Sequence, residues 1–599
     1  DTARVRVEAR IVGHDLLVHP PLGTGGAGGT LLLPVPQYDR TGVELDRNTA
    51  EQVFTASGAG SVVASIAFHR IVLRATGNSS TIRDNLVGMR ADSTIGTPAG
   101  AADHGITAGP TATNVTIRHN YVKVDNSGIR ADLFSTGLLI ELNEVDAPPT
   151  GHTLTFDAIL LIGGGTGATI THNLTLNQRG GGLEFGFNAG SRIQTNVDVV
   201  GNTVLHCGYT TPTGSTASTE GMGIAAYQVN GTNFRIRQNV VTQSSGPGLV
   251  VMDASNIDVS ENSFFGNGPG LTGGLGLGIE LDGASRDPNT YGGASGVTPN
   301  DGLKPAASAT APNRLIDYPI LTGALLEGGN LHLIGYVGSA PGQGTFASSR
   351  VELFLADATG NDQNGPVILS DGRSVPHGEG RTYLGTFTTG GTGTFRVTLP
   401  VSGVSVGSLL TATAADAATG GNTSEFGPNF PVQGVDYGDA PNSYLTTLAS
   451  NGPRHGISSP AAPYDYAVLR IGAAVSAETD ARGNPVVLDG FGDTFDDGRT
   501  LPMPALGTSS TPPYTVPITV VNQTGGPATL VAWIDFNRDG TFAVAEASTV
   551  VSVPAGTSGL VNVTWTSLPG LSAGRTYARF RLTADTDVGG TGGGLSATK

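Results

Sequence analysis

Cysteine, lysine and long apolar runs are scarce in this 599-residue sequence. Cys207 is the single cysteine, so the chain cannot form an internal disulfide, and a bound metal would have to provide any cross-link. The net charge is −17 and lysine occurs only at positions 123, 304 and 599, so the basic patch that nucleic-acid binding requires is missing. There is no run of about 18 apolar residues, so the sequence predicts no membrane-spanning helix.

Charged residues are also few, at 14%, whereas glycine is abundant, at 90 of 599 residues. This composition is typical of strands joined by frequent turns. Hydrophobic residues make up 38% of the chain, which is enough to predict folded domains rather than disorder. The length suggests about three or four domains. The chain begins at Asp rather than Met and shows no signal peptide, which fits a processed secreted protein or a fragment.

A short pattern recurs in the first half of the chain: a β-branched residue, two variable residues, Asn, one variable residue, and usually Val. Its copies contain Asn85, Asn120, Asn143, Asn173, Asn202, Asn239 and Asn262. Successive asparagines are 35, 23, 30, 29, 37 and 23 residues apart. A basal spacing in the low twenties suits one coil of a parallel β-helix, with three short strands and three turns. We expect each asparagine to lie at a turn, to tolerate left-handed geometry there, and to hydrogen bond to its neighbour one coil away.

With this repeat, the sequence resembles the right-handed parallel β-helix proteins of bacterial surfaces and exoproteins, over roughly residues 13–315. The resemblance implies stacked coils around a continuous aliphatic column. It predicts the fold better than the function, because the same solenoid carries both polysaccharide lyases and inert adhesin stalks.

Catalytic residues are not evident in the predicted solenoid. A lyase needs a strong base beside calcium-binding carboxylates, and a hydrolase needs clustered aspartates. Lys123 is the one mid-chain lysine there, and the histidines near turns show no metal-ligand spacing. Arg118, Arg235 and Arg237 fit ordinary outward strand positions better than a stripe that binds an acidic glycan. We therefore predict no enzymatic activity. A carbohydrate-active enzyme, or a glycan-binding protein that uses the solenoid face, is the alternative.

Longer alternating strands follow the repeats, such as "NLHLIGYV" at 330 and "SLLTATAAD" at 408. Gly, Pro and Asn turns separate them, which predicts a small β-sandwich. The segments "HGEGRTYLG" and "ATAADAATGGNTSEF" are similar to an Ig-like module that follows such β-helices in bacterial surface proteins. We assign residues 316–432 to this module.

Residues 534–546, "IDFNRDGTFAVAE", have the spacing of a calcium-binding loop, D-x-N-x-D-G followed by Glu at loop position twelve. Gly540 permits the tight bend. The predicted calcium ligands are the side chains of Asp535, Asn537, Asp539 and Glu546 and the carbonyl of Thr541. The alternative is a surface turn whose acidic side chains are merely solvated.

No helix pattern flanks this loop. Four blocks in order, from "VDYGDAPNSYLTTLASNGPRHG" to "AGRTYARFRLTADTD", are similar to a GEVED domain, a β-sandwich of bacterial secreted and surface proteins. We assign residues 433–599 to it, and the resemblance implies that the loop joins two strands. Trp533 and Trp565 are expected in the core. A second, less regularly spaced group of possible calcium ligands is Glu478, Asp480, Asp493, Asp496 and Asp497.

The two ends of the chain suggest self-association. The GEVED domain usually ends in a strand with its Gly-Glu-Val-Glu-Asp signature, whereas this chain stops at "GGTGGGLSATK", which would leave an open sheet edge. Residues 1–12 read as a free strand with one apolar face, formed by Val5, Val7, Ala9 and Ile11. This strand could add to the C-terminal edge of the next subunit and give a head-to-tail filament. The alternatives are that it caps the solenoid of its own chain, or that the true C-terminus is missing.

The sequence as a whole predicts an all-β protein: a right-handed parallel β-helix followed by two β-sandwich domains. We expect an extracellular bacterial protein, located at the cell surface or secreted, that is stabilised by calcium. Its expected role is structural or adhesive, as an adhesin, a biofilm matrix component or a filament subunit. Expected partners are further copies of the chain and cell-surface or matrix glycans, without nucleic acid or a membrane span.

Overall fold

The chain divides into two compact units, both built mainly of strands. The first unit comprises Asp1–Thr322, Ile334–Val397 and Leu409–Phe430, and the second comprises Gly323–Leu333, Thr398–Ser408 and Pro431–Lys599. This computed structural model describes residues 43–46, 52–69, 71–89, 105–124, 126–147, 157–186, 193–210, 220–268, 276–283, 296–308, 310–357, 363–369, 372, 374–416, 421–438, 440–457, 469–472, 481, 503–523 and 526–583.

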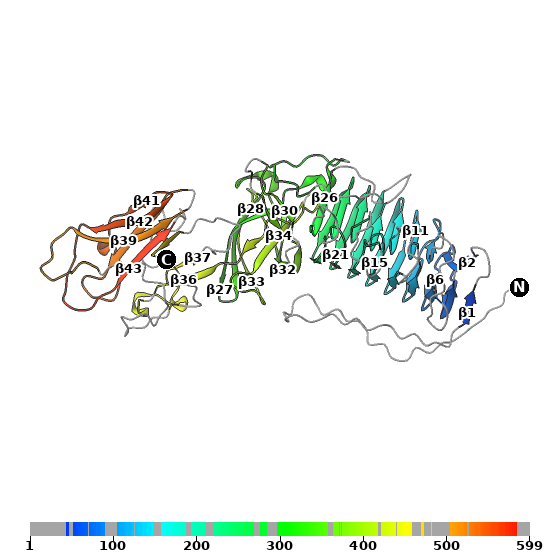
Figure 1. Ribbon diagram of the computed structural model, residues 1–599, viewed down its shortest axis with the longest axis horizontal. Coiled ribbons are helices and arrows are strands. Elements are labelled where there is room, and N and C mark those ends of the chain that lie inside the picture. Colours follow the sequence, from blue (N-terminus) through cyan, green and yellow to red (C-terminus); the bar gives the residue numbers. More distant parts are fainter. Residues whose placement is uncertain are drawn as a thin grey trace. The chain divides into compact units, whose positions relative to one another are not determined.

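Three parallel sheets run along the solenoid of the first unit (Figure 1). Consecutive strands of the chain belong to different sheets, so each full coil contributes one strand to each sheet. Sheet A contains β1 (Val43–Asp46), β4 (Ile66–His69), β7 (Leu86–Val87), β10 (Tyr121–Lys123), β13 (Glu144–Asp146), β16 (Leu174–Leu176), β19 (Thr203–Leu205), β22 (Val240–Thr242) and β25 (Ser263–Phe265). Sheet B contains β2 (Gln52–Ala56), β5 (Ile71–Ala75), β8 (Ile106–Ala108), β11 (Ile129–Asp132), β14 (Ile159–Ile162), β17 (Leu183–Phe185), β20 (Ile224–Tyr227), β23 (Leu249–Met252) and β26 (Ile279–Asp282). Sheet C contains β3 (Val62–Ala64), β6 (Thr81–Arg83), β9 (Thr116–Arg118), β12 (Leu138–Glu141), β15 (Gly165–Thr171), β18 (Gln194–Val200), β21 (Asn230–Arg237) and β24 (Ser255–Ser260).

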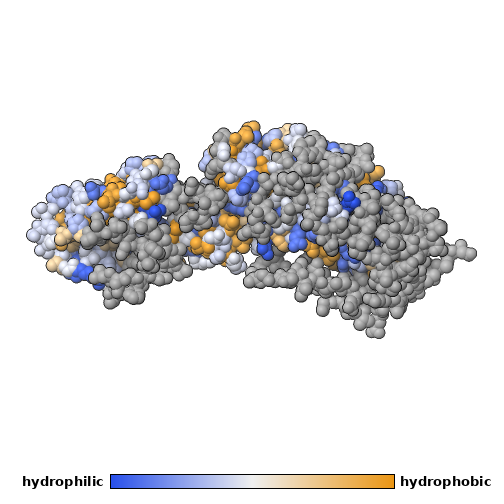
Figure 2. Space-filling view, in the orientation of Figure 1, coloured by the Kyte–Doolittle hydropathy of each residue, from blue (hydrophilic) through white to orange (hydrophobic). Residues whose placement is uncertain are grey.

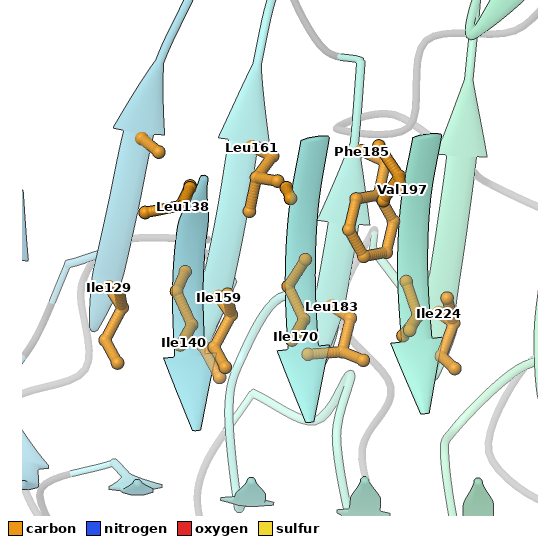
Figure 3. Packing of buried hydrophobic residues seen from close by; sticks show 14 of the residues in the cluster. Ile129, Leu138, Ile140, Ile159, Leu161, Ile170, Leu183, Phe185, Val197 and Ile224 are labelled. Carbon is orange, nitrogen blue, oxygen red and sulfur yellow. The ribbon is translucent and has the colours of Figure 1, made fainter. Parts of the chain in front are cut away.

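The interior of this solenoid is a continuous aliphatic column. Strand side chains alternate between the two faces of a sheet, and the parallel register places like residues above one another. Ile129 pairs with Ile159, and Ile159 pairs with Leu183 on the next coil. Figure 3 shows this row from sheet B facing Ile140 and Ile170 of sheet C. All of these side chains are fully buried, so the predicted column is confirmed.

An asparagine ladder runs beside the column. The side-chain Nδ2 of Asn85 donates to Oδ1 of Asn120 over 3.0 Å, and the same bond links Asn120 to Asn143 over 2.9 Å. The series continues through Asn173, Asn202, Asn239 and Asn262, each 2.9 or 3.0 Å from the next. Each Oδ1 also accepts the backbone N–H of the preceding asparagine, as between Asn143 and Asn173 at 3.0 Å. The predicted hydrogen bonds between coils are confirmed.

The left-handed backbone lies one residue earlier than we expected. It occurs at the residue before each asparagine, with φ between 53° and 68°. These residues are Asp84, His119, Leu142, His172, Gly201, Gln238 and Glu261. The asparagine itself turns its side chain along the stack, where a residue with both an amide donor and an amide acceptor can bond to identical neighbours above and below.

The end of the solenoid is sealed by carboxylates from the sandwich that follows. In earlier coils the turn amide donates to the next coil, as Gln238 N–H does to the Ser260 carbonyl. In the last coil the same amide, of Glu261, donates instead to Oε2 of Glu352 over 2.8 Å. Three more backbone amides have equivalent acceptors: Gly266 donates to Asp357, Asn267 to Glu379, and Leu281 to Glu425, over 2.9, 2.9 and 3.0 Å. The carboxylates thus replace the missing next coil.

Phe426 closes the aliphatic column at the same end. Its ring packs edge-on against Phe264 of the last coil and against Phe354 of the sandwich, with centroids 6.0 and 5.3 Å apart. A side chain at Gly278 would lie 2.6 Å from the Phe426 ring, so glycine is needed for this close approach. The "NTSEF" segment of the Ig-like resemblance, which lies between β34 and β35, therefore caps the solenoid.

Antiparallel strands form the sandwich. One sheet has the order β32 (Gly380–Thr388), β29 (Arg350–Ala356), β34 (Leu409–Ala415) and β35 (Phe430–Pro431), and another has β27 (Pro319–Glu327), β28 (Asn330–Val337) and β33 (Thr394–Pro400). A hairpin pairs β30 (Gln363–Pro366) with β31 (Ser374–His377). The described residues of this region include the 3₁₀ turns η2 (Pro312–Leu315) and η3 (Gly344–Phe346).

The described residues of the second unit form two three-stranded sheets and a hairpin. One sheet has the order β38 (Leu469–Ile471), β39 (Tyr514–Asn522) and β42 (Thr557–Trp565), and the other β41 (Val551–Val553), β40 (Ala528–Ile534) and β43 (Ala578–Thr583). The hairpin pairs β36 (Gly434–Tyr437) with β37 (Arg454–Ile457). The 3₁₀ turns are η4 (Asn442–Tyr444), η5 (Leu448–Ser450) and η6 (Val544–Glu546). The predicted all-β class, a parallel solenoid followed by antiparallel sheets, is confirmed.

Candidate calcium loop and carboxylate pair

The predicted calcium loop follows β40 directly and ends in η6. Gly540 has a φ of +83°, which lets the chain reverse, and Phe542 turns into a small apolar cluster with Trp533 and Tyr444. The loop joins strands, as the resemblance implied. Trp533 and Trp565 are buried, as predicted, and the Trp565 indole N–H donates to the Glu546 carbonyl over 2.9 Å.

Two carboxylates of the loop are buried close together. Asp535 is 0% and Glu546 1% exposed. Oδ1 of Asp535 accepts the Asp539 N–H over 3.1 Å, and Oδ2 accepts the Gly540 N–H over 3.0 Å. Glu546 accepts the N–H groups of Phe536 and Ala543 over 3.0 and 2.9 Å. Burial raises the pKa of Glu546, and the charge of Asp535 adds to this shift.

The other predicted ligands lie on the outer side of the loop. Asp539 is exposed, and its Oδ1 accepts the N–H and the hydroxyl of Thr541 over 2.9 and 2.7 Å. These bonds lower the pKa of Asp539. Asn537 donates from Nδ2 to Oδ2 of Asp539 over 2.9 Å. Within the described ranges, no group of three or more His, Cys, Asp or Glu side chains is gathered for a metal. The structure thus brings Asp535 and Glu546 together and turns Asp539 outward.

The donor set nevertheless fits a hard cation. Neither Asp535 nor Glu546 forms an ion pair with any residue that the structure describes, so these two buried carboxyl groups have no cationic side chain beside them there. Two carboxylates buried close together repel each other when both are ionised, and a bound cation or a proton removes this repulsion. Carboxylate, amide and carbonyl oxygens are the ligands that Ca²⁺ prefers.

Two sets of predicted residues cannot be placed. The second acidic group lies outside the described residues: Glu478, Asp480, Asp493, Asp496 and Asp497. The predicted assembly strand, residues 1–12 with Val5, Val7, Ala9 and Ile11, lies outside them too.

The outer face of sheet A carries a carboxylate pair that the sequence did not reveal. Glu144 and Asp146 project outward from β13, next to Tyr121 and Lys123 of β10 in the parallel register. Lys123 Nζ lies 2.6 Å from Oδ2 of Asp146, and Asn177 donates to its Oδ1 over 3.0 Å. Burial, together with the charge of Asp146, raises the pKa of Glu144 to about 7. Lys123 stands out in the sequence as the one mid-chain lysine of the solenoid. The carboxylates beside it come from the next coil, so the sequence alone does not place them together.

Other outward charges of the solenoid neutralise one another. Arg235 and Arg237 both reach Asp198, over 2.9 and 3.1 Å, and Arg118 lies 3.7 Å from Glu141. This agrees with ordinary outward strand positions. On the face drawn in Figure 2, hydrophobic residues of the described surface occur in several separate groups. Cys207 is fully buried, as expected for a core side chain, and burial raises its pKa to about 12.

The described residues contain no helix that is both long and apolar enough to cross a membrane.

Two family models match parts of the chain. Residues 103–292 match the right handed beta helix region, and residues 529–597 match the GEVED domain. The chain therefore carries a right-handed β-helix and a GEVED domain, which confirms the domain types that the two resemblances implied. The second match contains the whole loop from Asp535 to Glu546.

Two solved structures show remote similarity. One is the ORF18 protein of Geobacillus virus E2, with 10% identity over 65% of this chain and 66% of that protein, and a TM-score of 0.23. The other is the enzymatically active domain of tailspike protein 2 of bacteriophage CBA120, with 11% identity over 65% of this chain and 72% of that domain, and a TM-score of 0.18. At such TM-scores the two similarities carry no argument about function.

Proposed function

We propose that the protein is an extracellular bacterial structural or adhesive protein, stabilised by calcium, that acts as a filament or matrix subunit. The observation that carries the structural role is the solenoid itself. Two nine-stranded sheets and one eight-stranded sheet run through its described residues, and buried carboxylates of the sandwich accept backbone N–H groups at its end. Such a body supplies length and stiffness, because each coil is bonded to its neighbours along every sheet.

Calcium would bind in the loop that follows β40. The proposed ligands are the side chains of Asp535, Asn537, Asp539 and Glu546 and the carbonyl of Thr541. The ion would neutralise the two buried carboxylates, Asp535 and Glu546, that have no cationic partner among the described residues. An ion that binds only the folded state adds stability that disulfides cannot supply in a chain with one cysteine.

Assembly would proceed by strand addition between subunits, with residues 1–12 as the donor and an outer strand of the GEVED sandwich as the acceptor. Glycans of the cell surface or matrix are the proposed adhesion targets. We predict that deletion of residues 1–12 leaves folded monomers, because the donor strand is lost. Sedimentation velocity of the wild type and of the deletion variant measures their oligomeric states.

Paired substitutions provide a matched control. Val5→Asp with Val7→Asp places charge on the apolar face of the donor strand and should abolish assembly. Arg4→Ser with Arg6→Ser changes the opposite face and should preserve it. Assembly of the deletion variant at the wild-type concentration would rule out this route.

The carboxylate pair on sheet A favours a second candidate, a glycan-cleaving enzyme. Glu144, with its pKa raised to about 7, suits a general acid that protonates the leaving oxygen. Asp146 would deprotonate the attacking water. Residues two apart on one strand face are separated by roughly 7 Å, within the range of about 6.5–9.5 Å for inverting glycosidases.

An assay of reducing-end release from bacterial polysaccharides separates the two candidates. Under the structural role, the wild type releases no more than a Glu144→Gln variant. Release by the wild type that falls at least 100-fold in Glu144→Gln, but not in Glu141→Gln on the neighbouring sheet, would establish the enzyme instead.

A further inference from the structure

A tyrosine far from the loop in sequence contacts the buried Asp535. Tyr444 lies in η4, within the connection between β36 and β37. Its hydroxyl donates to Oδ2 of Asp535 over 2.7 Å, and the side chain is buried. The same oxygen accepts the Gly540 N–H, so Tyr444 completes the set of donors that fixes the orientation of this carboxylate.

The Tyr444 ring also packs against the loop. Its centroid lies 4.7 Å from that of Phe542, at loop position eight, and 5.3 Å from that of Tyr577. The Arg579 guanidinium lies 4.8 Å from the centre of the Phe542 ring and donates to the Tyr444 carbonyl over 3.2 Å. Tyr444 is thus held by the loop, by the strand β43 and by the segment before that strand.

Tyr444 is the anchor of its own segment. It is the one aromatic residue of the connection between β36 and β37. Its neighbours bond mostly within the connection: Oδ1 of Asn442 accepts the Thr446 N–H over 3.2 Å and the Thr447 hydroxyl over 2.9 Å. The next residue, Leu445, is 49% exposed.

We propose that Tyr444 is a positioning residue of the calcium loop. Calcium binding would therefore stabilise the packing of the connection between β36 and β37 against the GEVED sandwich. This inference rests on the proposed calcium binding. Partners that orient a metal ligand typically change metal affinity about 10–100-fold when they are removed. By reciprocity, an ion that fixes Asp535 also favours the docked position of Tyr444.

Terbium luminescence tests the first half, because Tb³⁺ replaces Ca²⁺ and is sensitised by nearby Trp and Tyr side chains. Tyr444→Phe removes the hydroxyl and keeps the ring. We expect its terbium Kd to rise about tenfold or more. Tyr437→Phe is the matched control, because Tyr437 also donates to a buried carboxylate over 2.7 Å, that of Glu327, and lies outside the loop. Its terbium Kd should equal that of the wild type.

Hydrogen exchange of the amides of residues 440–453 tests the second half. In the wild type, Ca²⁺ should slow this exchange, and in Tyr444→Phe the effect should be smaller. A wild type that binds no terbium would overturn both the calcium proposal and this inference. Terbium binding with equal Kd in the wild type and Tyr444→Phe would overturn the inference alone, as would exchange in the wild type that Ca²⁺ leaves unchanged.

Discussion

Phe426→Ala is expected to lower the free energy of unfolding of the first unit by about 3–5 kcal/mol, the usual cost of removing a buried aromatic ring. The ring closes the column between Phe264 and Phe354 and is 2% exposed. Its loss leaves a cavity where the last coil meets the sandwich. Gly278 and Gly380, whose backbones approach the ring, cannot fill it.

Denaturant unfolding of the full chain, followed by circular dichroism, measures this effect. Leu369→Ala is the control, because Leu369 is 69% exposed and its truncation should cost no more than about 0.5 kcal/mol. Equal free energies of unfolding of the Phe426→Ala and Leu369→Ala variants would show that the Phe426 ring does not stabilise the end of the solenoid.

Asn173→Ala is expected to destabilise the solenoid by about 1–3 kcal/mol, the usual cost of leaving one buried polar group without a partner. Oδ1 of Asn173 accepts both the N–H and the Nδ2 of Asn143, each over 3.0 Å. Alanine leaves the Asn143 N–H without this acceptor in the interior, whereas the Asn143 Nδ2 keeps its bonds to the Ile117 and Glu141 carbonyls. It also removes the Nδ2 that bonds to Asn202.

Asn196 provides a matched control, because Asn233 donates to its Oδ1 over 2.9 Å on the exposed face. Asn196→Gly removes the same kind of bond and suits the left-handed backbone there, with φ of 53°. Its cost should stay within about 0.5 kcal/mol. A loss at Asn173 no larger than that at Asn196 would mean that the buried ladder adds no stability.

The ladder could be predicted from the sequence because the repeat itself encodes it. Asparagines at a recurring position face their copies one coil away whatever the insertions between them. The left-handed residues could not be predicted, because positions such as Leu142 and His172 carry no glycine or other turn residue. Their backbone is set by the coil geometry. The capping carboxylates could not be predicted either. Glu352 and Glu425 lie 91 and 144 residues along the chain from the backbone N–H groups that donate to them.

The calcium loop, too, could be predicted from the sequence only in part. Its spacing is local, so all five proposed ligands could be named from one stretch of sequence. The burial of Asp535 and the outward turn of Asp539 depend on packing that spacing does not report. Tyr444 lies 91 residues from Asp535, and only the fold brings the two together. Likewise, Asp146 and Lys123 become neighbours through the register of consecutive coils.

Electron microscopy of the purified protein, in calcium and after chelation, tests the structural role most directly. We predict regular filaments with a constant subunit repeat in calcium, and their loss when the ion is removed from the loop containing Asp535 and Glu546. Monodisperse monomers in both conditions would contradict the account.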